Sequence, residues 1–239
     1  MRRLDLTLPT AAENLALDEA LLEEAETAGF PCETLRLWEP AAPLVVVGRS
    51  SQVEKEVRLD VCRELGIPVL RRASGGAAVL TGPGCLMYAL VLSRALRGGL
   101  RAIDRVHRFV LGTISGALEP LVPGVRCQGI SDLAVAGRKF SGNSVRCKRE
   151  HVLYHGTLLY DFRLELIDRC LAMPPRQPAY RGARPHADFV TNLPLEAAVI
   201  RAALASAWGA VEPLVDWPRE RTMRLAAEKY HCRPSNENR

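Results

Sequence analysis

One stretch of the chain decides the fold class: Ser131-Asp132-Leu133-Ala134-Val135-Ala136-Gly137-Arg138-Lys139-Phe140-Ser141-Gly142-Asn143-Ser144-Val145-Arg146. Two strand-like segments flank a turn near Ala136-Gly137, which predicts a β-hairpin. Side chains alternate between the faces of a strand, so Arg138 and Lys139 are expected on opposite faces and only one should point into a pocket. A short hairpin joins antiparallel strands, so this segment favours a mixed or antiparallel sheet over a doubly wound parallel one.

The segments on either side of this hairpin alternate between strands and helices. Leu4, Leu6 and Leu8 have the period of a half-buried strand. Thr10 and Glu13 have the spacing of a capping box at the start of a helix. Further strands are expected at 34–38, 44–48, 68–71, 86–92 and 152–160, and further helices at 59–65, 102–118, 164–172 and 195–208. The strands at 34–38 and 44–48 are interpreted as a hairpin with a proline-stiffened loop.

These elements predict an α+β fold with mixed, mainly antiparallel sheets flanked by helices. No internal repeat or low-complexity linker divides the chain, so residues 1–239 are expected to form a single domain. The last residues, from about 232, are polar and are expected to form a short tail.

Composition argues against several classes of function. Of the 239 residues, 48% are hydrophobic, and the net charge of +5 is spread along the chain rather than clustered as in nucleic-acid-binding proteins. No apolar run is long enough to span a membrane, and no apolar region follows the basic N-terminus as it does in a signal peptide. The seven cysteines are scattered without zinc-ligand spacing, so we expect no metal held by protein ligands. Reduced thiols favour a cytoplasmic location.

A glycine-rich bend follows the strand expected at 68–71. It reads Arg71-Arg72-Ala73-Ser74-Gly75-Gly76-Ala77-Ala78-Val79, so that two arginines enter a Gly-Gly turn. Glycine lets the backbone approach an anion closely, and arginine adds a forked donor for phosphate or carboxylate. The pattern alone leaves open an ordinary turn with solvated arginines, because Gly-Gly turns are common. Its spacing matches neither a Walker loop nor a dinucleotide-binding fingerprint.

Two further stretches contain residues suited to acyl-phosphate chemistry. The ammonium of Lys139 has rotatable donors that can follow an oxyanion, and the small polar run after Phe140 is unusual for an ordinary strand. The segment His155-Gly156-Thr157 places a ring and a hydroxyl beside a glycine that permits close approach of a ligand. Taken singly, Lys139 is equally an exposed hairpin cation and His155 a structural histidine.

In this order and spacing, the three stretches resemble the lipoate–protein ligase A family of the biotin and lipoate ligase superfamily. The loop at 71–79, the hairpin at 137–146 and the strand at 155–159 match the motifs of that family. The segments 14–20 and 45–49 are also similar, and the resemblance covers about residues 10–195. It implies a biotin/lipoate ligase-like catalytic domain without the C-terminal accessory domain that many bacterial members carry.

The resemblance implies an ATP-dependent lipoate–protein ligase. In that family ATP and lipoate react, assisted by Mg²⁺, to give an acyl-adenylate and pyrophosphate, and a lysine of a lipoyl-carrier domain then takes the acyl group. Lys139 is implied to bridge the acyl carbonyl and the α-phosphate, and Arg72 to hold phosphates; Mg²⁺ would arrive with ATP. The implied ATP- and acyl-adenylate-binding residues are Arg72, Ser74, Gly75, Gly76, Ala77, Ala78, Val79, Leu80, Asp132, Lys139, Ser141, Gly142, Arg146, His155, Gly156 and Thr157. The acyl tail is expected in an apolar slot lined by strands 86–92 and 152–159.

Two positions depart from the family pattern. Ala77 replaces the third glycine of the loop, which implies either a different loop shape or a position that never needed positive φ. Thr81-Gly82 stands where many relatives have His-Asp. The implied partners are lipoyl-carrier proteins, such as glycine-cleavage H protein or an E2 lipoyl domain, and a small accessory subunit that can be a separate polypeptide. The choice between lipoate and octanoate, the carrier and the oligomeric state are left open.

Two alternatives remain at this stage. The first is an acyltransferase of the same superfamily that uses a cysteine nucleophile, for which Cys127 lies just upstream of the lysine hairpin. The segment Gln128-Gly129-Ile130-Ser131-Asp132 looks more like the ligases, and the spacing from Cys127 to Lys139 looks shorter than in the transferases. The second alternative is a non-catalytic member that binds acyl groups or carrier domains. Retention of Arg72 and Lys139 favours an enzyme.

Overall fold

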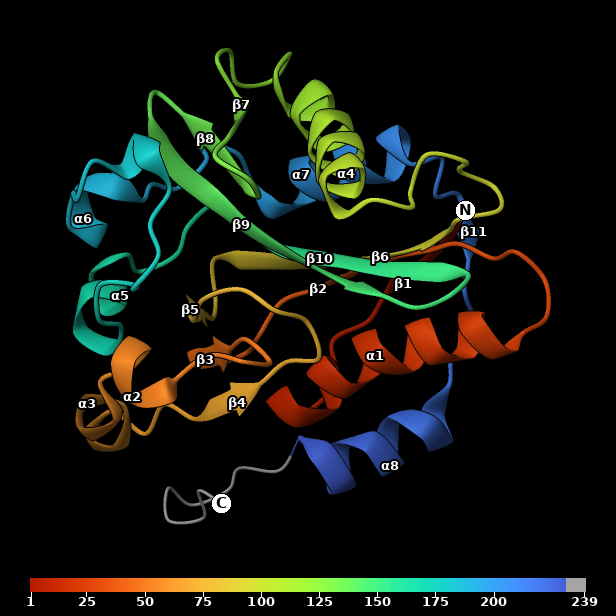
Figure 1. Cartoon of the computed structure of the whole chain (residues 1–239), viewed down its shortest axis with the longest axis horizontal. Coiled ribbons are helices and arrows are strands. Elements are labelled where there is room, and N and C mark those ends of the chain that lie inside the picture. Colours follow the sequence, from red (N-terminus) through yellow and green to blue (C-terminus); the bar gives the residue numbers. More distant parts are fainter. Residues whose placement is uncertain (231–239) are drawn as a thin grey trace.

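The computed structural model describes residues 1–230, and its largest element is an eight-stranded sheet (Figure 1). The strands lie in the order β11-β1-β2-β6-β10-β9-β8-β7. In that order, their bounds are Glu212–Pro213, Arg2–Asp5, Thr34–Trp38, Cys85–Ser93, His151–Leu159, Arg138–Cys147, Asp132–Val135 and Arg126–Gln128. β1 pairs in parallel with β2 and β11, and all other neighbours in this sheet are antiparallel. The polar tail expected from about residue 232 lies outside the described residues.

A second sheet has three strands in the order β4-β3-β5, with bounds Val69–Arg71, Leu44–Val47 and Val79–Thr81. β3 pairs in parallel with β4 and antiparallel with β5. The chain therefore leaves this sheet at the end of β4 and returns to it on β5. The glycine-rich segment forms the connection between those two strands.

The helices are α1 (Ala11–Thr27), α2 (Val53–Glu56), α3 (Leu59–Glu64), α4 (Ile103–Leu118), α5 (Glu165–Cys170), α6 (His186–Phe189), α7 (Ala197–Ala207) and α8 (Arg219–Lys229), with one 3-10 turn at Ala179–Arg181. α4 and α7 cover one face of the large sheet and α1 covers the other, with α8 packed on α1 (Figure 1). Among the described residues, no helix is both long and apolar enough to cross a membrane.

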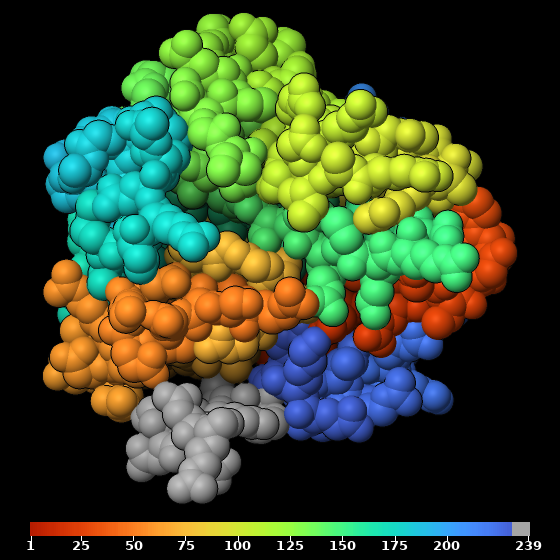
Figure 2. All heavy atoms as spheres, viewed as in Figure 1, coloured from red at the N-terminus to blue at the C-terminus, as the bar shows by residue number. Residues whose placement is uncertain are grey.

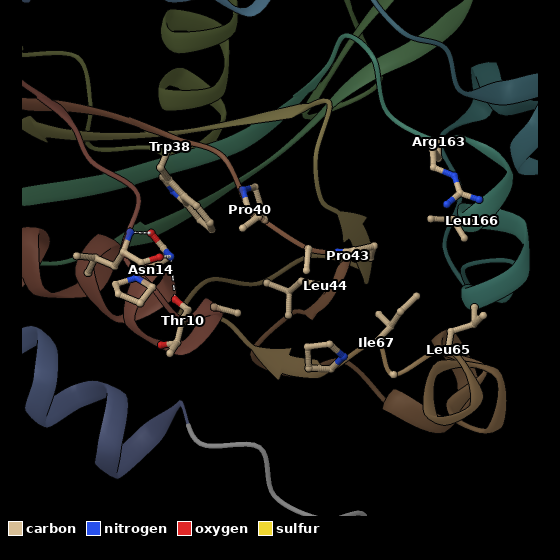
Figure 3. Close-up of a pocket in the computed structure, with 17 residues that line it drawn as sticks. Thr10, Asn14, Trp38, Pro40, Pro43, Leu44, Leu65, Ile67, Arg163 and Leu166 are labelled. Carbon is tan, nitrogen blue, oxygen red and sulfur yellow. Dashed lines mark hydrogen bonds between the residues drawn. The ribbon is translucent and has the colours of Figure 1, made fainter.

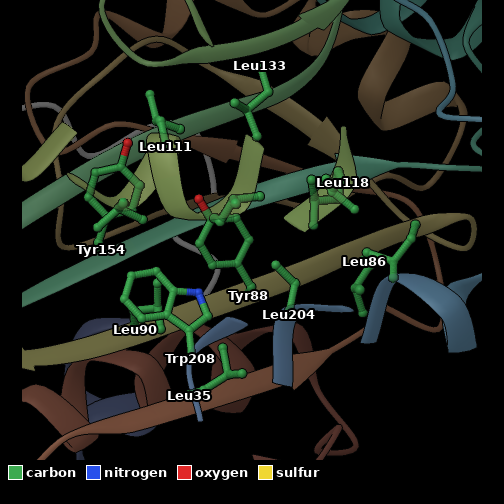
Figure 4. Packing of buried hydrophobic residues seen from close by; sticks show 14 of the residues in the cluster. Leu35, Leu86, Tyr88, Leu90, Leu111, Leu118, Leu133, Tyr154, Leu204 and Trp208 are labelled. Carbon is green, nitrogen blue, oxygen red and sulfur yellow. The ribbon is translucent and has the colours of Figure 1, made fainter. Parts of the chain in front are cut away.

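The central strands of the large sheet are buried on both faces. Every residue of β2, β6 and β10 is buried, and the register of β6 and β10 is continuous from His151 opposite Ser93 to Leu159 opposite Cys85. Side chains such as Tyr88, Leu111 and Trp208 fill the space between the sheet and the helices α4 and α7 (Figure 4). Burial on both sides explains why β6 has a nearly continuous apolar sequence instead of an alternating one.

The hairpin expected from segments 34–38 and 44–48 is wrong. β2 lies between β1 and β6 in the large sheet, whereas β3 lies at the centre of the small sheet. The two strands are each fully buried, and the Glu39–Pro43 connection carries the chain from one sheet to the other. Apolar periodicity identified both as strands but holds no information about their partners.

Most other predicted elements are confirmed within a few residues, including the mixed, mainly antiparallel sheet flanked by helices. The hairpin turns at Ala136 and Gly137, whose φ angles are 49° and 71°. β1 ends at Asp5 rather than Leu8. The prediction missed the short elements β5, β7, β11, α2 and α6 and the exposed helix α8. These elements are too short or too polar to give a periodic apolar signal.

The capping box at Thr10 is present as predicted. The Thr10 hydroxyl accepts from the amide of Glu13 at 3.1 Å, and the Glu13 carboxylate accepts from the amide of Thr10 at 2.9 Å. We expect Thr10→Ala to lower the free energy of unfolding by about 1 kcal/mol, measured by urea denaturation. Thr27→Ala is the control, because the Thr27 hydroxyl bonds only carbonyls of the preceding turn. Equal destabilisation by both variants would contradict a role for the capping box.

Candidate functional site

The loop between β4 and β5 folds around the buried side chain of Arg72. Its guanidinium donates to the carbonyl oxygens of Val46 at 3.1 Å, Ala77 at 3.0 Å and Gly75 at 3.1 Å. Burial lowers the pKa of Arg72 to about 10, and the nearby carboxylate of Glu56 opposes this shift. The forked donor that the sequence assigned to a phosphate is therefore occupied in organising the loop. Direct contact between Arg72 and a phosphate stays a prediction.

Donors from outside the loop hold its remaining carbonyl oxygens. The amide of Arg49 lies 2.8 Å from the Ser74 carbonyl oxygen, Ser144 Oγ lies 2.8 Å from that of Gly75, and Ser51 Oγ lies 2.9 Å from that of Gly76. Together with Arg72, these donors engage every carbonyl from Ser74 to Ala77. The loop is thus attached to β9 and to the segment after β3.

The backbone amides of the same loop differ from its carbonyl groups in their hydrogen bonding. Within residues 1–230, the amides of Gly75, Gly76 and Ala77 donate no hydrogen bond. The next amide, that of Ala78, donates to the Glu56 carboxylate from α2 at 2.6 Å. Successive free amides beside carbonyls that are all engaged are suited to binding an anion. The row available to a ligand is therefore Gly75–Ala77, and Ala78 already has an anionic partner.

Two glycines allow this loop to pack closely. Gly76 has φ of +90°, and a Cβ added to Gly48 would lie 1.9 Å from the carbonyl oxygen of Gly76. Among the described residues, Ala136 and Ala183 are the non-glycine residues with positive φ, so Ala77 is not in the left-handed region. The alanine at position 77 is therefore compatible with the observed loop. The other departure, Thr81-Gly82, packs into the core, where the Thr81 hydroxyl contacts the sulfur of Met87 at 3.1 Å.

Lys139 reaches from the start of β9 back towards β8. Its Nζ lies 2.7 Å from Asp132 Oδ1, and the hydroxyl of Tyr180 donates to Asp132 Oδ2 at 2.9 Å. The side chain of Lys139 keeps 26% of its surface exposed, and a Cβ added to Gly142 would lie 2.9 Å from its Nζ. Arg138 points elsewhere, donating to carbonyls beside α6, including that of Val190 at 2.7 Å. The two cations of the hairpin therefore diverge, as alternation predicts, and Lys139 is the one beside Asp132.

Strands β9 and β10 connect Lys139 to the loop. The amide of Gly142 donates to the Thr157 hydroxyl at 3.3 Å, and Ser74 Oγ lies 2.5 Å from His155 Nε2. Arg146 Nη1 lies 3.5 Å from the carbonyl oxygen of Ala73, at the start of the loop. The remaining members of this region, Ser141 and Gly156, lie next to Asn143, and a Cβ on Gly156 would lie 1.8 Å from Asn143 Oδ1.

Cys127 lies on the edge strand β7, opposite Leu133 of β8. The residue is exposed at the surface, but its thiol is partly shielded from water, which raises the pKa of the thiol. No cation lowers that pKa, and the phenols of Tyr88 and Tyr154 are its ionisable neighbours. A nucleophilic thiolate needs a nearby positive charge, and neither Arg126 next to it in the chain nor Lys139 of the hairpin lowers the pKa of this thiol.

The structure thus gathers most of the predicted site residues into one connected region. Its members come from the loop, from β9 and from β10, and Figure 2 shows the surface hollowed where the orange segment meets the green and cyan ones. Val79 and Leu80 belong to β5, and Leu80 is buried in the core. Sequence reasoning missed contacts made by Asp18, Ser51, Glu56, Ser144 and Tyr180. Their residue types gave no signal, because each contact joins segments distant in the chain.

A cavity also lies away from this region. It has a volume of about 480 Å³ and is lined by residues such as Thr10, Trp38, Leu44 and Ile67, none of which belongs to the predicted site (Figure 3). In the described part of the chain, no group of three or more histidine, cysteine or acidic residues is arranged to hold a metal ion.

Comparison with known proteins identifies the family. The model of the lipoyl protein ligase A/B catalytic domain matches residues 10–203, and the chain belongs to this family. A protein of Aeropyrum pernix described as a lipoate-protein ligase A is 35% identical over 170 residues, covering 71% of this chain and 61% of the relative. An octanoyl-[GcvH]:protein N-octanoyltransferase of Kyrpidia tusciae is 37% identical over 166 residues, covering 62% and 57%. The matches thus span less than two thirds of these relatives' own length.

Solved structures share the fold. The bipartite lipoate protein ligase of Thermoplasma acidophilum superposes with a TM-score of 0.79 at 22% identity, covering 95% of this chain and 92% of that one. A lipoate-protein ligase A bound with ATP gives a TM-score of 0.76 at 21% identity, covering 95% and 94%. At this level of identity the comparison establishes the lipoate ligase fold, as the sequence predicted.

The close packing of Gly48 against Gly76 gives a test of the anion-binding loop. We expect Gly48→Ala to push the loop out of place, because the new methyl group would collide with a backbone carbonyl. Affinity for inorganic pyrophosphate, measured by isothermal titration calorimetry, should fall about ten-fold or more. Gly116→Ala on α4 is the control, because its Cβ would meet open space. Unchanged pyrophosphate affinity in Gly48→Ala would rule out this loop as the anion site.

Proposed function

We propose that this protein is an ATP-dependent lipoate–protein ligase that converts lipoate or octanoate to an acyl-adenylate and transfers the acyl group to a lysine of a lipoyl-carrier domain. The observation that carries this proposal is the row of free amides at Gly75, Gly76 and Ala77, together with the ammonium of Lys139, which the contacts of β9 and β10 join to the same region. A nucleoside triphosphate needs such donors, and successive amides and a lysine supply them.

The proposed reaction has two steps. In the first, a carboxylate oxygen of the acyl substrate attacks the α-phosphorus of ATP, the bond to the β-phosphate oxygen breaks, and pyrophosphate leaves. In the second, the uncharged amine of the carrier lysine attacks the acyl carbonyl carbon, and AMP leaves with the bonding electron pair. The amine loses a proton to solvent as the amide forms.

Lys139 has the role of a fixed positive charge in both steps. Asp132 holds its Nζ at 2.7 Å, and Tyr180 holds Asp132 in turn. A positioned ammonium stabilises the negative charge that develops on phosphate oxygens in the first step and on the acyl oxygen in the second. Mg²⁺ would enter bound to the phosphates, in keeping with the oxygen-rich coordination that it prefers. The free loop amides and Lys139 are suited to binding the phosphates of a nucleotide that already carries its own Mg²⁺.

Relatives support the choice of substrates. A Thermoplasma acidophilum protein of the same fold was solved with bound lipoic acid, and another lipoate-protein ligase with bound ATP. We propose that the acyl chain lies against the apolar side chains of β6 and β10, which border the site. The bipartite Thermoplasma ligase was studied with its E2 lipoyl domain, and the Kyrpidia transferase acts on a GcvH protein. Carrier domains of these kinds and an accessory subunit are the proposed partners, in a cytoplasmic setting.

The octanoyltransferases among the relatives define the second candidate function. In that chemistry Cys127 would attack the acyl donor and form a thioester, without ATP. Among the described residues, no cation is found to activate the exposed Cys127 thiol, whereas Lys139 is held in position by Asp132. We therefore favour the ligase.

The two functions differ in their need for ATP. We expect the wild-type protein to catalyse exchange of radiolabelled pyrophosphate into ATP in the presence of lipoate or octanoate. Cys127→Ala should retain this exchange, and Lys139→Ala should reduce it by about 100-fold or more while leaving the fold intact by circular dichroism, because it removes charge stabilisation at the reacting phosphorus.

Lys148→Ala, one residue beyond the far end of β9, is the control for loss of a lysine and should retain full exchange. Absence of exchange in the wild-type protein, together with loss of carrier acylation in Cys127→Ala, would overturn the ligase and establish the transferase. Full exchange by Lys139→Ala would overturn the role assigned to that lysine.

A further inference from the structure

A chain of four buried polar residues leads from the glycine-rich loop to α1 and β2, on the face of the large sheet that α1 covers. Ser74 Oγ lies 2.5 Å from His155 Nε2, and His155 Nδ1 lies 3.4 Å from Asp18 Oδ2. The other oxygen of Asp18 accepts from Arg36 at 2.6 Å. The residues are at most 9% exposed and come from the loop, β10, α1 and β2 respectively. Asp18 and Arg36 are therefore joined to the loop without facing the surface.

At the Arg36 end of this chain, the guanidinium fixes which atoms donate and which accept hydrogen bonds. Arg36 is fully buried and also donates to the carbonyl and side-chain oxygens of Asn14 and to the carbonyl of Leu6. A buried guanidinium needs an anionic partner, and Asp18 is the carboxylate in contact with it. Ionised Asp18 accepts hydrogen bonds and donates none. Its Oδ2 therefore requires a donor from the histidine ring.

For a neutral imidazole ring, this requirement places the proton of His155 on Nδ1. With the proton on Nδ1, the neutral ring has an unprotonated Nε2 that can only accept. The hydroxyl of Ser74 must then be the donor in its contact with Nε2. The lone pairs of Ser74 Oγ remain for Arg72, whose Nε lies 3.2 Å away. Each polar atom along the chain thus has one defined direction of donation, from Ser74 through His155 to Asp18.

We propose that Asp18 is a positioning residue for the anion-binding loop: through the tautomer of His155 it orients the Ser74 hydroxyl and so holds the free amides of Gly75–Ala77 towards the ligand. Ser74 opens this row, and its carbonyl and hydroxyl are both fixed, by Arg49 and His155. A hydroxyl pointing the other way would compete with the Arg72 contact that folds the loop. The inference deepens the proposed function and rests on it for its link to ATP.

The tautomer can be observed directly in the wild-type protein. Long-range ¹H–¹⁵N correlation spectra of ¹⁵N-histidine-labelled protein, with His155 assigned through His155→Gln, should show the proton on Nδ1. Ser74→Ala should show the same tautomer, because Asp18 sets it. A proton on Nε2 in the wild-type protein would overturn the proposal, whichever reaction the enzyme catalyses.

Asp18→Asn tests the consequence for the loop. Arg36 needs an acceptor, so the amide oxygen should stay on Arg36 and the NH₂ group should face His155, moving the ring proton to Nε2. We expect the affinity for inorganic pyrophosphate to fall about ten-fold and the KM for ATP to rise similarly, with a smaller change in kcat. Asp18→Glu, which keeps the acceptor, should recover part of the affinity.

Glu19→Gln is the matched control, because Glu19 is a buried carboxylate on the same helix that binds Lys229 and Tyr230 and not the loop. Glu19→Gln should lower the melting temperature about as much as Asp18→Asn does, and it should leave the affinity for pyrophosphate within two-fold of the wild-type value. Unchanged pyrophosphate affinity in Asp18→Asn, or an equal loss in Glu19→Gln, would overturn the positioning role. If the wild-type protein binds pyrophosphate but catalyses no ATP exchange, the proposed function fails while this test still stands.

Discussion

The site depends on one constraint: the carbonyl groups of the glycine-rich loop must be engaged so that its amides can face a ligand. Arg72 meets much of this requirement from inside the loop, since its guanidinium donates to carbonyls on both sides of the bend. Burying that cation costs free energy, which its bonds to carbonyl oxygens and the proximity of Glu56 offset. A lysine has no planar fork and could not satisfy several carbonyls at once.

The rest of the fold serves to bring distant donors to this loop. The loop leaves the small sheet on β4 and returns on β5, and it contacts β9 through Ser144 and β10 through His155. The hairpin of β8 and β9 places Lys139 beside Asp132 in the same region. The buried Asp18–Arg36 pair extends the network to α1 and β2. Both sheets and the first helix are therefore needed before the loop has a defined shape.

Local sequence was sufficient for the elements whose signals are local. The turn at Ala136-Gly137, the capping box at Thr10 and the long apolar strands could all be predicted, because each depends on neighbours in the chain. The pairing of β2 and β3 could not, since an apolar strand fits either sheet. The part that Arg72 plays in folding the loop was also out of reach: its residue type suggested a phosphate ligand, which stays a prediction, and its donors to carbonyl oxygens are visible only in the three-dimensional structure. Resemblance to a family supplied what periodicity lacked, namely that the three motifs belong to one site.

The central claim is that the amides of Gly75, Gly76 and Ala77 receive the anionic part of the substrate. Titration of the ¹⁵N-labelled protein with MgATP, followed by amide chemical shifts, tests it most directly. We expect the largest shifts on these three amides and a smaller shift on the Ala78 amide, which donates to Glu56. Saturable binding of MgATP that leaves the Gly75–Ala77 amides unshifted would contradict it.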